Sequence, residues 1–336
     1  MLLSVHGRYG HRAKWTVDRD LNMAGNGARR GRHALNETHE TALSGVFFAA
    51  SAFLIWGLSP VYWKAIGAVG PLEIVMHRVV WSFAFLMVII LVARQWRELC
   101  EVLRSGRTLM VLAASALLVA LNWLIYIWAV NNGYLLQASL GYYINPLVNV
   151  VLGMTFLRER LRPAQMTAVL LAAAGVIYLT VQYGQFPWIS LVLAFSFGLY
   201  GLIRKVAPVS SLVGLTVETM LMSGPALAYL VFLGARHGGS IFRGDLRLDL
   251  LLMSTALMTA VPLLLFTAGA RRIRLSTLGL MQYLAPSGMF LLAVLYYREP
   301  FTSAQLWTFV MIWTALAIYS ADSLNIYRRE HRPAGK

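Results

Sequence analysis

A few ionisable side chains stand inside long apolar segments of the sequence, and they are the first candidates for chemistry. Glu73, His77 and Arg78 share one such segment, and Glu218 lies in another. A charge near the centre of a bilayer costs from about 2.5 to more than 10 kcal/mol, so these groups should face a cavity or a partner. We expect Arg78 and Glu218 either to bind a charged part of a substrate or to pair with neighbours that hold helices together.

Glu73 and His77 are four residues apart and therefore share one face of a helix. Histidine titrates near neutral pH, which makes His77 a candidate for gating or for moving a proton. Glu73 lies close to the end of its segment, where a carboxylate can also be merely interfacial.

Cationic side chains end two more apolar segments. Lys64 ends the first, and Arg204 lies beside Lys205 at the end of another. Long cationic side chains often reach from a helix end to the membrane interface. The alternative is a cationic rim at each of two mouths of a pathway, which would favour anionic or zwitterionic solutes.

Amides, one hydroxyl and two prolines form the second group of candidates. The polar side chains are Asn122, Tyr142, Asn145, Asn149 and Gln282. Each could bind a substrate or hydrogen-bond a neighbouring helix. Pro146 and Pro286 predict helix breaks that free a backbone carbonyl for another partner. Tryptophans and tyrosines in the first and third apolar segments could stack on a substrate or face lipid.

Several kinds of enzymatic site are missing from the sequence. The single cysteine, Cys100, excludes a disulfide framework and any cysteine-based zinc or iron–sulfur site. No lysine belongs to a phosphate-binding GK[ST] loop, and no Gly-x-Ser-x-Gly motif occurs. We therefore predict no catalytic residues, no cofactor and no metal.

The composition is that of a membrane protein. Of 336 residues, 58% are apolar and 13% are charged, whereas soluble domains have about 45–50% and 25%. The apolar residues form blocks of about 20, the length of a membrane-spanning helix. The predicted fold class is therefore all-α integral membrane, with ten transmembrane helices. Their spans are 42–63, 71–93, 108–130, 133–157, 164–181, 188–206, 211–234, 249–270, 276–297 and 303–321.

The loop charges predict the orientation. The net charge is +15, and most lysines and arginines lie in the two tails and in the loops on the same side. The positive-inside rule then places both termini in the cytoplasm. The positive charge is explained by topology, so we expect no binding to nucleic acid. The opposite side holds only Lys64, Arg236, Arg243, Arg247 and Arg298.

The chain repeats itself at a spacing of 140 residues, which also relates Arg78 to Glu218. Each half would hold five helices, and an odd number makes the second half start on the opposite side of the membrane. Such inverted repeats are a design of secondary transporters. The other matching residues are Tyr143 and Tyr283, Pro146 and Pro286, Arg158 and Arg298, Glu159 and Glu299, and Gln165 and Gln305.

Four regions follow from these patterns. Residues 1–41 are polar and rich in glycine and arginine, so we expect a disordered cytoplasmic tail. Met23 is an alternative start, which would make residues 1–22 an upstream extension. The remaining regions are the two five-helix repeats, 42–181 and 188–321, and a cytoplasmic C-terminal tail, 322–336.

Five stretches carry a resemblance to known proteins. They are FLIWGLSPVYWK (53–64), HRVVWS (77–82), NWLIYIWAVNNGYLLQASLGYYINPLVNVVLGMTFLRERL (122–161), LAFSFGLYGLIRK (193–205) and RLSTLGLMQYLAP (274–286). They resemble the EamA family of the drug/metabolite transporter superfamily. The resemblance implies ten helices in two five-helix repeats, the bacterial inner membrane, and export or exchange of a small solute.

These features predict a secondary transporter that exports or exchanges a small metabolite or drug by alternating access. Protons or an exchanged solute are the candidates for the coupled species. The alternative is a membrane-embedded enzyme acting on a lipid-linked substrate, which would need clustered His, Asp or Glu at one membrane face. A non-transporting regulator would carry a sizeable folded domain outside the membrane, and the loops are too short for one.

Overall fold

The computed structural model describes residues 41–330, except positions 64, 67–68, 133, 185, 237–238, 242–243, 297 and 299–301. Lys64 therefore lies outside the described residues, as do positions 1–40 of the predicted N-terminal tail and positions 331–336. Residues Gly45–Lys336 form one unit by their contacts.

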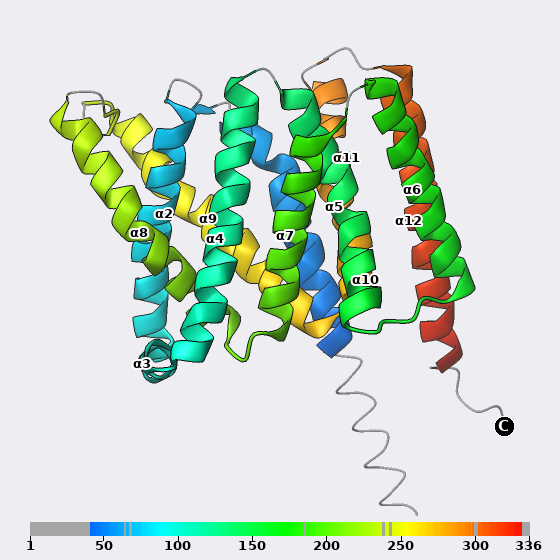
Figure 1. Cartoon of the computed structure of the whole chain (residues 1–336), viewed down its shortest axis with the longest axis horizontal. Helices are drawn as coiled ribbons and strands as arrows, with labels where there is room; N and C mark the ends of the chain where they lie inside the picture. Colours follow the sequence, from blue (N-terminus) through cyan, green and yellow to red (C-terminus); the bar gives the residue numbers. More distant parts are fainter. Residues whose placement is uncertain are drawn as a thin grey trace, which may run out of the picture. The chain divides into compact units, whose positions relative to one another are not determined.

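Helices make up all the regular structure of the described residues. The first runs over Thr41–Trp63. A π-helix, Leu292–Tyr296, continues directly from α11. The other helices, shown in Figure 1, are α2 (Pro71–Val92), α3 (Trp96–Arg104), α4 (Gly106–Asn131), α5 (Leu135–Phe156), α6 (Pro163–Tyr183), α7 (Trp188–Val206), α8 (Ser211–Ala235), α9 (Leu246–Arg272), α10 (Leu275–Met281), α11 (Leu284–Leu291) and α12 (Ser303–Glu330).

The predicted all-α membrane fold with ten transmembrane helices is confirmed. Nine segments of the described chain are long and apolar enough to span a bilayer, with Leu275–Tyr296 counted as one, and α5 contributes the shorter stretch Leu140–Phe156. The predicted tail from residue 322 begins instead as part of α12. There, Asp322 forms an ion pair with Arg162, the residue that precedes α6. The distance between Oδ2 of Asp322 and Nη2 of Arg162 is 2.5 Å.

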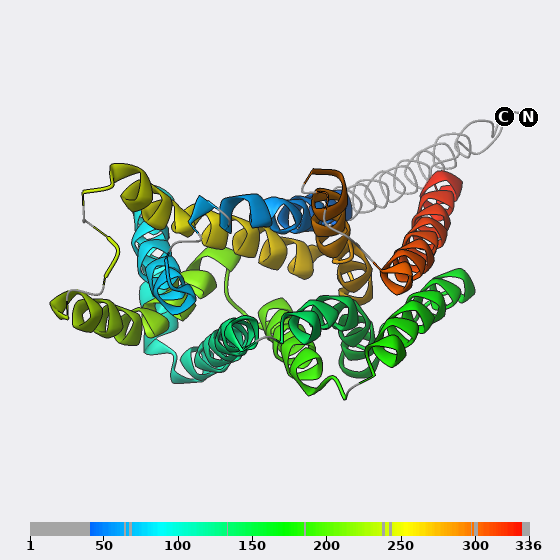
Figure 2. The same cartoon turned by 90° about the horizontal axis from the view of Figure 1, so that it is seen from above.

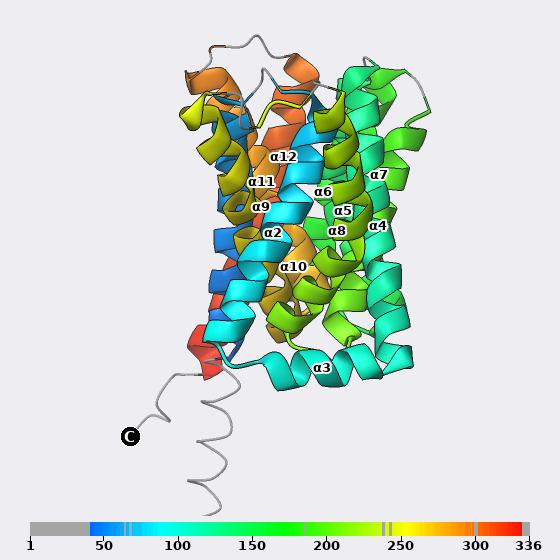
Figure 3. The same ribbon diagram turned by 90° about the vertical axis from the view of Figure 1, so that its left-hand side faces the viewer.

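The sequence pattern does not predict α3, because a helix of nine residues is too short to give a spanning signal. It lies crosswise at the ends of α2 and α4 (Figure 3). Leu99 and Val102 belong to the same buried cluster as Val213 of α8. Glu98 accepts the backbone N–H of Ser210, at 2.9 Å, just before α8. We call this end of the helices the α3 face and the other end the opposite face.

The ninth predicted span is divided into α10 and α11 by a turn at Gln282 and Tyr283. Pro286 follows in the first turn of α11, where a helix tolerates a residue without an N–H. The predicted break at Pro146 is wrong, because α5 continues through this proline. Neighbouring helices can support such an interior proline. Here the Tyr283 hydroxyl donates to the Tyr143 carbonyl at 3.1 Å, next to the Tyr142 carbonyl that loses its helical donor at Pro146.

Helices of both halves are interleaved. Seen from above, the first helix, α9, α10–α11 and α12 lie on one side, and α4, α7, α5 and α6 lie on the other (Figure 2). If each helix is replaced by its counterpart in the other half, one observed helix–helix contact is converted into another observed contact. For example, α2 packs against α9, and its counterpart α8 packs against α4. The equivalent helices α6 and α12 pack against each other.

Local details also recur 140 residues apart. Arg158 and Arg298 both adopt a φ angle of 54°, which is uncommon for a residue with a side chain. A backbone N–H donates to Oε1 of Gln165 at 3.1 Å before α6, and another donates to Oε1 of Gln305 at 2.8 Å before α12. These recurrences are consistent with the proposed repeats, 42–181 and 188–321.

The packing of α10 against α5 requires a glycine. A Cβ atom at Gly279 would lie 2.6 Å from the carbonyl oxygen of Pro146 and 2.9 Å from Cβ of Asn149. Both atoms are fixed by the backbone, so neither can move aside cheaply. The first helix approaches α11 similarly at Gly57, where a Cβ would lie 3.2 Å from the Ala285 carbonyl oxygen.

Gly279→Ala should therefore push α10 away from α5 and lower the thermal stability. Overpacking of this kind costs about 1–3 kcal/mol. The measurement is the unfolding temperature of the purified protein in detergent. Gly106→Ala is a matched control, because a Cβ there meets nothing within 4 Å. If Gly279→Ala unfolds at the same temperature as the control, the close packing is wrong.

Candidate functional site

A cavity of about 680 Å³ lies between helices of both halves. Its walls come from the first helix, α2, α4, α5, α7, α9 and α11, together with Val69 before α2 and Gln282 in the turn between α10 and α11. The predicted candidates that line it are Arg78, Asn122, Tyr142, Asn145, Gln282 and Pro286.

The cavity occupies the half of the helices nearer the opposite face. On α2 its lining residues run from Pro71 to Arg78, and on α5 they run from Ala138 to Asn145. Both stretches lie in the first half of a helix that starts at the opposite face. The cavity thus reaches from the opposite face to about the middle of the helices.

Aromatic rings from both halves form the floor of the cavity. Phe266 lies 6.0 Å from Phe53, 5.8 Å from Trp56 and 5.3 Å from Phe197, measured between ring centroids. Phe53, Trp56 and Phe197 line the cavity. Phe266 does not line it, because it lies on α9 about one turn after the lining residue Leu263, nearer the α3 face, and it has no exposed surface. We call these four rings the aromatic floor. It lies at the end of the cavity nearer the α3 face.

Amide side chains link the walls of the cavity to one another. Asn122 donates from Nδ2 to the Leu193 carbonyl at 2.8 Å, so α4 is tied to α7. Asn149, buried behind the cavity wall, donates to Oδ1 of Asn145 at 3.2 Å and to Oε1 of Gln282 at 2.8 Å. This second link holds the break between α10 and α11 against α5.

Arg78 carries the charge of the cavity. Its guanidinium carbon lies 4.9 Å from the ring centroid of Trp63 and 4.8 Å from that of Trp123, which are cation–π distances. Its Nε donates to Oγ1 of Thr259 on α9 at 2.9 Å. The described lining of the cavity contains no aspartate or glutamate, so this positive charge has no carboxylate partner there.

Glu218 lies outside the cavity lining and is paired with Arg204. Neither side chain has exposed surface, and Nε of Arg204 lies 3.5 Å from Oε1 of Glu218. The Ser115 hydroxyl donates to the same Oε1 at 2.5 Å, and Nη2 of Arg204 donates to the Ser211 carbonyl at 3.0 Å. The guanidinium fits because Gly214 has no Cβ, which would lie 2.0 Å from Nη1. Arg204 therefore links α7 to α8 and does not reach a rim of the cavity.

Lys205 and Glu159 hold the turn between α9 and α10 at the α3 face. The Lys205 ammonium donates to the carbonyl oxygen of Ala270, at 2.7 Å, and to that of Ile273. Glu159 accepts the backbone N–H of Ser276 at 2.9 Å and its hydroxyl at 2.6 Å. A cation at a helix C-terminus and a carboxylate at an N-terminus both complement the helix dipole.

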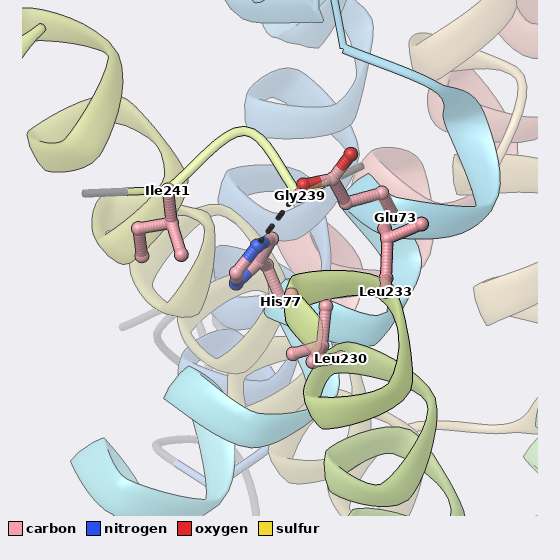
Figure 4. A pocket seen from close by; sticks show the side chains of 7 residues that line it. Glu73, His77, Leu230, Leu233, Gly239 and Ile241 are labelled. Carbon is pink, nitrogen blue, oxygen red and sulfur yellow. Dashed lines mark ion pairs between the residues drawn. The ribbon is translucent and has the colours of Figure 1, made fainter. Parts of the chain in front are cut away.

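Glu73 and His77 share a helix face, as predicted from their spacing, and line a second cavity of about 260 Å³ between α2, α8 and the loop after α8 (Figure 4). Nε2 of His77 lies 3.7 Å from Oε1 of Glu73, which also accepts the backbone N–H of Ser240 at 2.6 Å. The His77 side chain is 3% exposed, and neither ring nitrogen has a hydrogen-bond partner among the described residues. The apolar lining residues include Leu230 and Leu233 of α8.

Comparisons with known proteins agree with this architecture. The model of the EamA-like transporter family matches residues 43–181. An uncharacterized transporter of Vibrio cholerae is 49% identical and covers 85% of this chain and 94% of its own length. Protein RarD of Escherichia coli is 46% identical and covers 85% and 96%, respectively. The chain belongs to the EamA-like transporter family.

This EamA family member also shares its fold with a solved crystal structure. The TM-score is 0.63 at 21% identity, and the match covers 88% of this chain and 99% of the other. The family resemblance inferred from the sequence is thus confirmed, and with it a multi-pass membrane protein of a transporter family.

Some residues of the site in this EamA family member cannot be singled out from the sequence. Trp63 and Trp123 are two of ten tryptophans, and no spacing sets them apart as the partners of Arg78. Thr259 looks like any small residue of an apolar helix. Glu159 is visible only as one of the residues that match at the repeat spacing. The weak available signal for Trp63 and Trp123 is that each lies in a stretch carrying the family resemblance.

Glu218→Ala should lower the unfolding temperature of this EamA family member strongly, because it leaves the Arg204 charge buried without a carboxylate partner, at a cost of about 3–5 kcal/mol. The double variant Arg204→Met, Glu218→Leu removes both charges and should regain most of the loss. Thermal unfolding of the single and double variants in detergent measures the coupling. A double variant as unstable as Glu218→Ala would contradict the pairing.

Proposed function

We propose that this chain carries a small solute across the bacterial inner membrane by alternating access, with the 680 Å³ cavity as its solute site. The observation that carries the proposal is a cavity that ends at mid-depth between two halves of the chain. Its volume is in the range of about 300–1,000 Å³ typical of small-molecule sites. Inverted repeats place solute sites at such an interface near the bilayer midplane.

The loop charges support a cytoplasmic α3 face, with both termini on that side. In this orientation the cavity faces the periplasm, and the aromatic floor closes the path to the cytoplasm. An exporter or exchanger would release its solute from this conformation. It would load the solute after the aromatic floor parts and the opposite face closes.

An enzyme acting on a lipid-linked substrate remains the second hypothesis. The described lining of the cavity offers no aspartate, glutamate or histidine for general acid–base catalysis. The relatives are also named as transporters. Both observations favour transport over catalysis.

The variant Ser59→Cys, in a Cys100→Ser background, tests the site. Ser59 lines the cavity, so a membrane-impermeant maleimide added outside intact cells should label the introduced thiol. In proteoliposomes the same label should block counterflow of an isotope-labelled mixture of amino acids and organic acids, measured by mass spectrometry. Thr267→Cys in the same background is the control, because Thr267 is fully buried and does not line the cavity.

Two outcomes would count against the proposal. Labelling of the Ser59→Cys variant only after the membrane is permeabilised would contradict the orientation. Full counterflow after complete labelling would show that the cavity is not the solute path.

We also propose that His77 couples transport to protons. It is buried, and Glu73 on its own helix and Asp249 of α9 are the carboxylates that act on it electrostatically. The described residues of α8 that line this smaller cavity are apolar or glycine. Protonated His77 would be stabilised by the two carboxylates, and neutral His77 by the apolar wall. Since Arg78 is the next residue of α2, a shift of this helix would also move the wall of the larger cavity.

His77→Gln should remove most of the pH dependence of counterflow between about pH 5 and 8, where histidine changes charge. Counterflow of the same labelled mixture is measured over this range for the variant and the unmodified chain. Glu73→Gln, which leaves the imidazole in place, should shift the pH profile without flattening it. A His77→Gln variant that keeps the original profile and the original unfolding temperature would exclude His77 as the coupling group.

A further inference from the structure

The wall of the cavity carries an unbalanced positive charge. Arg78 is the charged side chain of the described lining, and no aspartate or glutamate is present there to neutralise it. Two indoles and one hydroxyl stabilise the guanidinium only in part. A cation inside a membrane-spanning helix without a counterion is costly, so its retention indicates that something else supplies the negative charge.

The nitrogens of Arg78 that have no described hydrogen-bond partner indicate which anionic group would bind there. Its Nε is used by Thr259, whereas Nη1 and Nη2 hydrogen-bond to no described residue. The indoles of Trp63 and Trp123 lie within cation–π distance of the guanidinium and supply no hydrogen-bond acceptor for these nitrogens. Two parallel N–H donors match the two oxygens of a carboxylate.

The rest of the cavity fits an apolar and flat molecule. Seven of the 26 described lining residues are aromatic, and Tyr126 and Tyr142 lie with ring centroids 6.0 Å apart in an edge-to-face arrangement. Such walls stack on planar groups and exclude water. The charge of one arginine in the described lining matches that of a monoanion.

We infer that the solute of this cavity is an organic monoanion with a carboxylate bound by Arg78 and an aromatic or similarly flat apolar body against the tryptophans and tyrosines. This inference rests on the proposed function, because it names the substrate class of the same cavity.

A matched series of probes tests the charge requirement. 3-Phenylpropanoate, 3-phenylpropanamide and 3-phenylpropylamine share one body and differ in the polar end. Each is added to the purified full chain in detergent, and the unfolding temperature is recorded. The carboxylate should raise it in a saturable manner, and the amide and the amine should not. Arg78→Gln should weaken the apparent affinity for the carboxylate about tenfold or more, and Arg78→Lys should retain part of it.

Arg236→Gln is the matched control. The Arg236 guanidinium also lies over a ring, 4.5 Å from the centroid of Phe232, but it is exposed and lies outside the cavity lining. This variant should bind 3-phenylpropanoate as the unmodified chain does. Because Arg78→Gln could alter folding, its unfolding temperature without probe is measured in the same series.

Protection of the Ser59→Cys thiol from maleimide separates the two proposals. Slower labelling with the carboxylate, lost when Arg78→Gln is added, supports the inferred substrate class. Equal protection by the amide or the amine, protection that survives Arg78→Gln, or no protection by the carboxylate overturns it. In each of these cases the proposed function still stands if labelling of the Ser59→Cys variant blocks counterflow. If counterflow continues after labelling, the proposed function is contradicted, whatever the result with the carboxylate.

Discussion

The hydrocarbon interior of a bilayer holds no water, so each polar group inside the helices must find its partner within the protein. Most of those described here do. Glu218 is paired with Arg204 and accepts from Ser115, and Asn149 binds the side chain of Gln282 across the break between α10 and α11. Arg78 differs, because the described lining of its cavity holds no carboxylate to pair with it. The presence of a counterion thus distinguishes the arginine that holds two helices together from the arginine that is available to a ligand.

The helices could be predicted almost completely from the sequence, because about 20 consecutive apolar residues are a direct requirement of the bilayer. What could not be predicted depends on tertiary contacts. Pro146 and Pro286 give the same local signal, yet α5 continues through the first, whereas the chain turns just before the second. Near both prolines, α10 packs closely against α5 at Gly279, and the Tyr283 hydroxyl in the turn before Pro286 donates to a carbonyl of α5. The helix α3 is amphipathic and short, and its position depends on burial of Leu99 and Val102 against other helices.

The candidate residues were predictable by type, but their partners were not. A charge in an apolar segment indicates an interior position, and this applies to both Arg78 and Glu218. Nothing in the sequence indicates that Glu218 is paired with Arg204, which comes from a different helix, or that Arg78 lies between Trp63 and Trp123. Equivalent positions at the repeat spacing have therefore acquired different roles, since a spacing of 140 residues conserves depth and not surroundings.

The aromatic floor has a counterpart within the same chain. At the repeat spacing, give or take one residue, Trp56 corresponds to Phe197 and Phe266 corresponds to Tyr126. Phe266 now packs against Trp56 and Phe197 from the α3 face, while Tyr126 lines the open cavity on the other side. In a chain that alternates, Tyr126 would replace Phe266 against the same two rings, so apolar surface uncovered on one side would be matched by apolar surface buried on the other. Under the proposed alternating access, the two conformations would bury similar amounts of apolar surface at these rings, which would keep their free energies close.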